Sequence, residues 1–559
     1  MSKNFLIMKY TLLVCFTFIV VFTLAQSPSE MVVITSKKNK TEVRTDKDGQ
    51  LLVNVSRKDV KKFKAAGEVL YSDFGAKGDG KSDDIDAIAA THAFANQQGL
   101  KVKANDQAIY YINGKNRTAI IQTDTNFGNA AFIIDDTNVE DRTAHVFMVN
   151  SKLSPYKIAG ISSLKRDQKN IDIPLSGPCI VTVSDSTVRR YIRFGPNQNN
   201  GSQQTDIFIV DKNGNVDMNA PIIWDFNQIT EIMARPIDEK TLTISGGRFT
   251  TVANNAESRY TYYRRGFAIQ RSNVLVKGLE HRVTDEADHG APYGGFINIS
   301  DCAQVKVENC ILTGHKTYET IGSAGIKVSM GTYDITVNRA LTVSFVNCSQ
   351  TNDINDDRYW GILGSNYSKN LVYDSCNFSR FDAHMGVANA TIRNSTLGHQ
   401  GINAIGSGIL TVENSIIRGR NLVNLRSDYG STWDGELIIR NCTFVPSGGK
   451  PVVASLIGGS NSGNHDFGYT CYMPEKITID GLHIDDSAHP VEYNGPAIFT
   501  NFNPDMTDPS YLEKFPHVRT QEVVLSNVII ASGKTLRLSD NAFMFKDVKV
   551  NPKEGGIQE

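Results

Sequence analysis

The sequence predicts an all-β solenoid in which short parallel strands stack coil upon coil, and three observations carry this prediction. A phrase of alternating apolar residues ending in Asn and then Cys or Ser recurs along the second half of the chain. Gly is frequent, at 45 of 559 residues, and Pro is sparse, at 17, which suits many strands joined by turns. A glycine-rich segment leading into an Ala-rich helix stands upstream of the repeats.

Composition excludes some classes of protein. The chain is 40% hydrophobic, so it has enough apolar material for a large core and is not a disordered chain. Its 58 basic and 59 acidic residues give a net charge of −1, which argues against a dedicated nucleic-acid binder. Affinity for a polyanion must therefore come from local clusters of cationic side chains.

The amino terminus predicts export. Lys3 and Lys9 precede an apolar run that ends at Ala25, so residues 1–25 are expected to form a signal peptide. An uncleaved membrane anchor is the alternative. No later segment approaches the length of a membrane span, so the mature chain is expected to have none. Residues 26–66 are charged and sparsely apolar, and are expected to be a linker or an edge segment.

Residues 73–84 carry the most specific motif, DFGAKGDGKSDD, which leads into a helix running to about Asn96. The spacing of a phosphate-binding loop is absent. The motif resembles the opening of the pectate-lyase superfamily of right-handed parallel β-helices, which includes bacterial and phage glycan-active proteins. The resemblance, with the repeats, covers residues of about 67–100 and 241–550. It implies a structural cap at the N-terminal end and a bacterial polysaccharide lyase of pectate-lyase or chondroitin-lyase type.

Residues 67–240 are expected to hold this cap and the early coils, interrupted by a β-rich insertion. Prolines and the polar run 195–204 mark loops there, and 207–210 and 222–225 look like strands. Residues 241–550 are expected to form the main β-helix with the active groove, and 551–559 a tail.

The repeat explains why the coils stack. Its anchors from residue 309 to 441 are 38, 28, 19, 20 and 27 residues apart, a spacing typical of a solenoid. Asn tolerates the left-handed backbone of a tight bend, and stacked Asn side chains can hydrogen-bond along the pile. The anchors are Asn309, Asn347, Ser375, Asn394, Asn414, Asn441 and Asn527.

The residue after each anchor is expected to point inward as a small filler. Ser occupies this slot twice and the number of cysteines after residue 25 is odd, at seven, so we expect Cys310, Cys348, Cys376 and Cys442 to be free and buried. A ladder of disulfides is the alternative, since stacked positions about 4.8 Å apart are within bridging reach.

Equal offsets from the anchors should lie on one line along the stack, about 4.8 Å apart per coil. Four to nine residues past the anchors, this line carries a concentration of cations and imidazoles. Its members are Arg282, His315, Lys316, Arg380, His384, His399, Arg418 and Arg420. One coil adds Arg426, Tyr429 and Trp433 nearby. Such a ridge suits an extended anionic polymer, and acidic polysaccharides containing uronic acids are the natural candidates outside a cell.

Eliminative cleavage of a uronate chain needs a cation at the carboxylate, a base for the C5 proton and an acid for the leaving oxygen. We assign Arg380 to the cation, His399 to the base, and His384 or Tyr429 to the acid. The expected substrate-binding residues are His315, Lys316, Arg418, Arg420, Arg426, Trp360 and Trp433, the tryptophans stacking on sugar rings. The ordinary readings are that a single Arg on a solenoid face is solvated, that His384 is a buried turn residue, and that Trp433 packs in a loop.

Two other functions stay open. Asp353, Asp356 and Asp357, or the run Asp285, Glu286 and Asp288, could bind Ca²⁺ or act as the acid and base of a glycoside hydrolase. The segment GHQG, residues 398–401, resembles the Gly-His-Gly of polygalacturonase-type hydrolases, although that family's paired Asp and its Arg-Ile-Lys are not convincingly present. A non-catalytic glycan-binding solenoid is the third possibility. The identity of the uronate glycan is left open, and glycosaminoglycans and pectin-like chains both fit.

Overall fold

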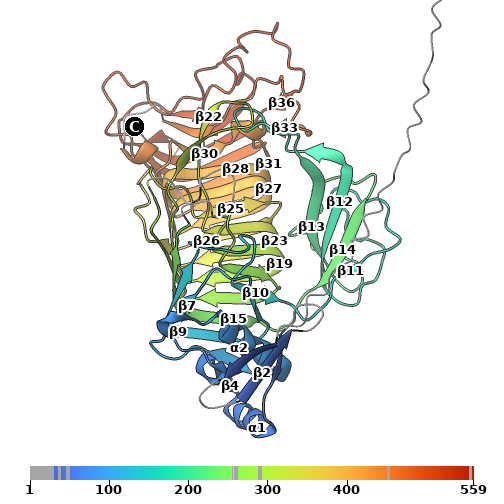
Figure 1. Ribbon diagram of the computed structural model, residues 1–559. Helices are drawn as coiled ribbons and strands as arrows, with labels where there is room; N and C mark the ends of the chain where they lie inside the picture. Colours follow the sequence, from blue (N-terminus) through green and yellow to red (C-terminus); the bar gives the residue numbers. More distant parts are fainter. Residues whose placement is uncertain are drawn as a thin grey trace, which may run out of the picture.

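The computed structural model describes residues 31–35, 40–45, 51–254, 256, 262–287, 293–449, 454–552 and 557–558. The expected signal peptide, residues 1–25, and Asp288 lie outside the described residues. The protein is a right-handed parallel β-helix with a helical cap at its N-terminal end (Figure 1), which confirms the predicted fold class.

The cap is built around the predicted helix. Helix α2 (Ile85–Gln98) follows Asp84, whose carboxylate accepts the backbone N–H groups of Lys77 and Gly78 at 2.7 and 3.0 Å. The glycine-rich motif thus folds around one aspartate, and the buried face of α2 covers the open end of the core. The preceding segment, expected to be a linker or edge, contains an antiparallel sheet of β1 (Met31–Thr35), β2 (Lys40–Thr45) and β3 (Leu51–Asn54), and helix α1 (Arg57–Ala66).

Among the described residues, the coils form one sheet of 28 strands that closes around a continuous apolar core. Its N-terminal strands are β4 (Glu68–Leu70), β5 (Asp79–Asp83), β6 (Lys101–Lys103), β7 (Ile109–Ile112), β8 (Ala119–Ile121), β9 (Thr125–Asp135), β10 (Phe147–Asn150), β15 (Leu242–Val252), β16 (Phe267–Gln270), β17 (Val274–Lys277) and β18 (Glu280–Thr284). The central strands are β19 (Ile297–Glu308), β20 (Ile311–Leu312), β23 (Ile335–Val346), β24 (Ser349–Gln350), β25 (Leu363–Asn366), β26 (Lys369–Asp374), β27 (Asn377–Arg393), β28 (Thr396–Glu413), β29 (Ile416–Ile417), β30 (Asn421–Leu425) and β31 (Trp433–Phe444). The last are β32 (Ser455–Gly458), β34 (Lys476–Ile484), β35 (Ala497–Phe499), β37 (Glu522–Ile530), β38 (Lys549–Pro552) and β39 (Ile557–Gln558).

The Asn anchors lie at the same bend of successive coils. Asn309, Asn347, Asn394, Asn414 and Asn441 have φ values between 49° and 54°, in the left-handed region that Asn tolerates. The Asn347 side chain donates to Oδ1 of Asn309 at 2.7 Å, so part of the ladder is hydrogen-bonded. The predicted common line is confirmed.

The slot after each anchor faces the core. All seven cysteines of the described residues are free and buried, which confirms the prediction for Cys310, Cys348, Cys376 and Cys442. Ser395 continues the slot, and its hydroxyl accepts the backbone N–H of Cys376 at 3.0 Å.

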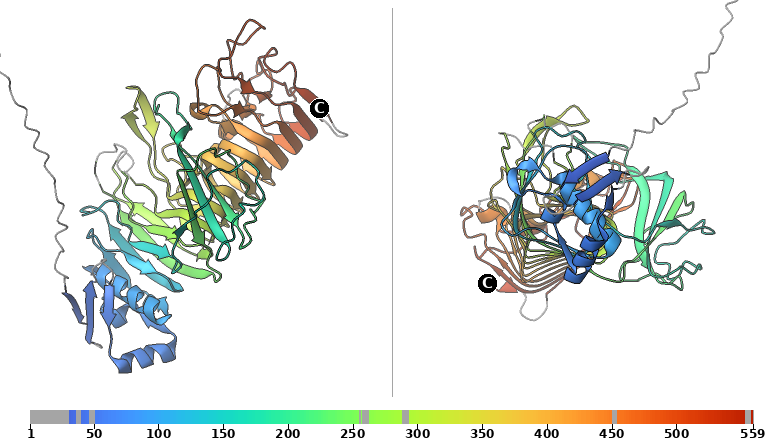
Figure 2. Two further views of the ribbon diagram at one scale, coloured as in Figure 1. Left: turned by 90° about the vertical axis from the view of Figure 1, so that its right-hand side faces the viewer. Right: turned by 60° about the horizontal axis from the view of Figure 1, so that its bottom comes forward.

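The insertion leaves the stack after β10 and returns at β15. It forms a four-stranded antiparallel sheet of β11 (Tyr156–Lys157), β14 (Glu231–Pro236), β12 (Cys179–Arg190) and β13 (Ser202–Val210), with a small core of its own. Figures 1 and 2 show this sheet standing at one side of the coils. A buried ion pair between Asp206 and Lys369, at 2.7 Å, fastens it to β26.

Among the described residues, no helix is long and apolar enough to cross a membrane.

Candidate functional site

The predicted ridge follows one corner of the coils. Strand pairing puts Ile311, Ser349, Asn377, Thr396 and Ile416 in register, so the residues a few positions later leave the same corner in each coil. Residues at equal offsets from the anchors therefore do lie at the same corner of successive coils. The environments along this corner nevertheless differ, and they separate the ridge into a closed part and an open part.

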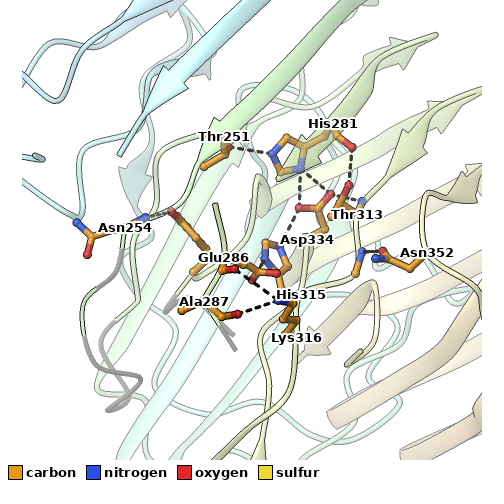
Figure 3. A network of polar contacts seen from close by, with 12 residues as sticks. Thr251, Asn254, His281, Glu286, Ala287, Thr313, His315, Lys316, Asp334 and Asn352 are labelled. Carbon is orange, nitrogen blue, oxygen red and sulfur yellow. Dashed lines mark hydrogen bonds and ion pairs between the residues drawn. The ribbon is translucent and has the colours of Figure 1, made fainter. Parts of the chain in front are cut away.

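The closed part is a buried network around Asp334, which directly precedes β23 (Figure 3). Asp334 accepts from Nδ1 of His281 at 2.8 Å, from Nε2 of His315 at 3.1 Å and from the backbone N–H of Thr313 at 2.9 Å. Nε2 of His281 contacts the Thr251 hydroxyl at 2.9 Å. Every hydrogen-bonding direction of the carboxylate thus points into the protein.

Electrostatics match this enclosure. Burial opposes the charged forms, but hydrogen bonds to Asp334 and Glu286 outweigh it and raise the pKa of His315 to about 9. The two histidines likewise overcome burial at Asp334 and hold its pKa below the ordinary value. His315 is 1% exposed, so its prediction as a substrate-binding residue is wrong. Lys316 Nζ donates to the Ala287 carbonyl at 2.8 Å beside the same network.

The second part lies over β27, where residues alternate between the apolar core and the outer face of the strand. We call it the open site because the side chains of Arg193 and Asp428, at its edge, keep 19% and 21% of their surface exposed. Phe381 and Ala383 enter the core, so Arg380, Asp382 and His384 project from the other face of the strand. Arg380 Nη2 pairs with Asp382 at 2.7 Å, and its Nη1 donates to Gln400 at 2.8 Å.

Arg380 is also covered by aromatic rings. Its guanidinium carbon lies 5.0 Å from the Trp360 ring centroid and 5.7 Å from that of Tyr333. It is 4% exposed. Trp360 therefore stacks on Arg380, which replaces the predicted stacking on a sugar at this ring face.

A second carboxylate joins the cluster through η2 (Ser427–Tyr429), a short 3₁₀ turn. Asp428 accepts from Arg426 Nη2 at 2.7 Å and from Arg193 Nη2 at 2.8 Å. Arg426 also lies 3.7 Å from Asp382. Burial raises the pKa of Asp428, but Arg426 and Arg193 outweigh it and hold that pKa below its usual range.

His384 and Tyr429 complete the site. Nδ1 of His384 lies 2.8 Å from Oδ1 of Asn366, an acceptor, so Nδ1 carries the proton and Nε2 keeps a free lone pair. Burial lowers the pKa of His384 well below its ordinary value, and the charge of Arg426 adds to this. The Tyr429 ring lies 5.6 Å from the His384 ring, and burial raises the pKa of Tyr429 to about 12. The imidazole is therefore neutral and the phenol protonated near neutral pH.

Four predicted residues lie elsewhere. Trp433 is 0% exposed, lies in the core and donates Nε1–H to the Gly408 carbonyl at 2.9 Å, so its prediction as a sugar-stacking residue is wrong. His399 Nδ1 contacts the Ile354 carbonyl at 3.0 Å and its Nε2 is buried. His399 and Arg380 therefore do not face one open sugar site. Arg418 donates to Asn355 at 3.0 Å, and Arg420 is exposed.

The proposed calcium ligands do not converge. Asp356 pairs with Arg358, and Asp353 accepts the backbone N–H of Asn355 at 2.9 Å. Within the described residues, no group of three or more His, Cys, Asp or Glu side chains is arranged to hold a metal ion. Asp357 is exposed on the same loop. Calcium dependence stays an untested prediction.

Sequence reasoning missed four parts of the open site. Asp382 and Asp428 carried a signal, because each lies two residues after an Arg of the predicted ridge on the same strand face or turn. Tyr333 and Arg193 carried none: Arg193 comes from the loop of the insertion between β12 and β13, which no offset from an anchor reaches. Beside it, Phe194 is 56% exposed.

Comparisons with known proteins address the fold more than the site. No family model matches the chain. A capsule KL64-specific depolymerase of Klebsiella phage P510 is 32% identical over 100 residues, which are 15% of this chain and 10% of that protein. The matched segment thus spans about a tenth of the relative's length.

Solved structures extend the comparison to most of the chain. The Gp54 tailspike of Acinetobacter baumannii bacteriophage AP22, solved with A. baumannii capsular saccharide, has 12% identity and a TM-score of 0.50, covering 90% of this chain and 81% of the tailspike. The chain has the fold of a phage tailspike. A second tailspike, gp61 of Pseudomonas phage phi297, has 13% identity and a TM-score of 0.47 over 83% of this chain and 80% of that one. The likeness to these tailspikes concerns the fold alone.

Proposed function

We propose that the protein is an exported depolymerase that cleaves an acidic, uronate-containing polysaccharide of the bacterial surface by β-elimination. One observation carries this proposal: a neutral imidazole with a free lone pair, His384, lies in a cluster with one uncompensated positive charge. Within the part of the chain that the structure describes, Arg193, Arg380 and Arg426 pair with two carboxylates, Asp382 and Asp428. The phage relative is named a capsule-specific depolymerase, which supports a polysaccharide of the bacterial surface as the substrate.

The first step needs a cation at the substrate. The uronate carboxylate would approach Arg426 and Arg193, which already sit at the surface end of the cluster, and neutralising it acidifies the C5 proton. Arg380 is enclosed by Trp360 and Asp382 and acts as a positioning residue. Binding of an anion also opposes the arginine charges that depress the pKa of His384, so the base strengthens when substrate arrives.

The bond changes then follow. Nε2 of His384 takes the C5 proton, the electron pair forms the C4=C5 double bond, and the C4–O4 bond breaks. The departing O4 takes the proton of Tyr429, whose raised pKa keeps the phenol protonated until that moment. The proposed base is thus His384, whereas the sequence predicted His399. Tyr429, one of the two acids that the sequence predicted, remains the proposed acid.

Hydrolysis has less support. A hydrolase needs one carboxyl group that is protonated near neutral pH, together with a second carboxylate. Asp382 is paired with Arg380, and the lowered pKa of Asp428 keeps it ionised. Neither is suited to be the general acid.

The test is a screen of the mature protein on uronate-containing glycans, read by the ultraviolet absorbance of the unsaturated product. We expect His384→Ala to lower product formation by roughly 10²-fold or more while polymer binding persists. New reducing ends without absorbance would mean hydrolysis. Binding with no cleavage of any glycan would mean a non-catalytic solenoid.

A further inference from the structure

A cavity of about 290 Å³ lies between the insertion and the coils, next to the open site. Arg166, Arg190, Trp224 and Asp225 line it from the insertion, and Ser407 and Asp434 line it from the coils. Its volume is near the lower end of the range for small-ligand pockets, about 300 Å³. It therefore suits a ligand the size of a single ring, enclosed from two sides.

The walls have the chemistry of a carbohydrate subsite. The ring centroid of Trp224 lies 6.2 Å from that of Tyr469, and the Arg190 guanidinium carbon lies 4.7 Å from the Trp224 centroid. Aromatic rings present flat apolar faces, and the ion pair of Arg166 with Asp434, at 2.8 Å, places donors and acceptors beside them. A pyranose ring has the matching combination of apolar C–H faces and hydroxyl groups.

Charge distinguishes this cavity from the His384 site. Two arginines, Arg166 and Arg190, line it together with two carboxylates, Asp225 and Asp434, so no positive charge is left uncompensated. A bound carboxylate would meet these two acids as well as the arginines, and burying a charge without a matched partner is costly. Binding of a neutral sugar does not bury a charge, and its hydroxyl groups can hydrogen-bond to the arginines and to the carboxylates.

The cavity is close enough to serve the same polymer. Tyr191 lines the cavity, and its ring centroid lies 6.3 Å from that of Tyr429. The Tyr429 ring in turn lies 5.6 Å from His384. One wall of the cavity is thus separated from the proposed base by a single tyrosine, within the length of a short oligosaccharide.

We propose that this cavity binds a neutral pyranose, a hexose or an acetamidohexose, of the glycan whose uronate lies at His384. The inference rests on the proposed function for the order of the two sugars, whereas the neutral-sugar site stands on the cavity itself. The substrate is then a heteropolymer in which uronate and neutral residues are neighbours, and a polymer made only of uronate leaves this cavity without a matched ligand.

The experiment uses the full mature chain with N-acetyl-D-glucosamine, D-galactose and D-glucuronate as separate probes, followed by tryptophan fluorescence. The chain has three tryptophans, and Trp433 is buried in the core. We expect one of the neutral sugars to change the emission, Trp224→Phe to remove that change, and Ser407→Phe, which fills the cavity, to weaken binding at least about tenfold. Thr411→Phe, on the same strand β28 but outside the cavity, is the matched control and should bind as the parent does.

Three results would overturn the inference: no response to either neutral sugar, equal binding in Ser407→Phe and the parent, or tighter binding of D-glucuronate than of both neutral sugars at this cavity. Repeating the titration in His384→Ala separates the two proposals. Neutral-sugar binding that persists in His384→Ala while elimination is lost is the expected result. Neutral-sugar binding by the parent chain with no elimination of any uronate glycan would instead refute the proposed lyase function and leave the subsite in place. Elimination that is unchanged in Ser407→Phe on every cleaved glycan would refute the role of the subsite in substrate binding.

Discussion

The Asp334 network and the His384 site use the same kinds of residue at neighbouring positions of one solenoid face, yet one is closed and the other open. In the first, the carboxylate is the centre and two histidines and a backbone N–H saturate it. In the second, three arginines hold the carboxylates and a histidine is left with a free lone pair. The difference teaches that the hydrogen-bond partner of an imidazole decides its charge. The carboxylate of Asp334 stabilises His315 as a buried cation. The amide oxygen of Asn366 accepts a hydrogen bond from His384, which stays neutral and can act as a base.

The largest effect is expected from breaking the closed network. Asp334→Asn removes one of the two anionic partners of the protonated His315 and the carboxylate that His281 contacts, so the free energy of unfolding should fall by about 3–5 kcal/mol. Urea unfolding followed by circular dichroism measures this, with the exposed Asp353→Asn as the control. A loss below about 1 kcal/mol would show that the network contributes little to stability.

The closed network should also make stability depend on pH. His315 has a folded-state pKa of about 9, above its ordinary 6.5, so its contribution is complete below pH 6.5 and is lost as the pH rises through 9. The shift corresponds to about 3 kcal/mol. Urea midpoints between pH 7 and 10 should therefore fall, and His315→Gln should flatten the fall. Parallel slopes in both proteins would contradict the assignment.

At the open site, the same kind of substitution should change catalysis more than stability. Arg426→Gln removes the cation proposed to bind the uronate, so turnover should fall by roughly 10²-fold. Because Arg426 helps to depress the pKa of His384, the acid limb of kcat/KM should move to higher pH. An unchanged pH profile with reduced turnover would separate Arg426 from the base.

The smallest effect is expected at His399, which lies in β28. Its Nδ1 is bound to the Ile354 carbonyl and its Nε2 is buried, so His399→Ala should change turnover by no more than about threefold. A steady-state assay on the glycan cleaved by the parent measures this. A loss near that of His384→Ala would return the role of base to His399.

Sequence reasoning predicted the fold well and the site in part, for a common physical reason. The Asn anchors report the backbone bend at which they sit, so Asn309 and Asn347 could be placed in register without a structure. Arg380 and His384 were likewise grouped from their offsets, and Arg426 and Tyr429 were added because they follow in a neighbouring coil. Offsets do not show which side chains cover others, so they do not show that the Trp360 ring lies over Arg380.

The remaining parts of the site depend on contacts that no periodic pattern encodes. Arg193 contacts Asp428, which lies 235 residues later in the sequence, because the insertion folds back over coils that follow it in the chain. The residues around Trp433 do not show from sequence that its side chain is buried. Its position in β31 nevertheless directs that side chain into the core. Loops and insertions therefore have to be seen in three dimensions before roles can be assigned.

The way the insertion is fastened has a consequence for biosynthesis. Residues 156–236 leave the ribosome long before Lys369, Asp428 and Gly468, which hold the insertion through Asp206, Arg193 and Arg190. The arginine from the insertion can thus reach its aspartate only after most of the polypeptide has been translated. If the chain is exported as an extended polymer, the cluster that holds His384 is assembled only after translocation, so the cytoplasm of the cell that makes the protein never contains the assembled cluster.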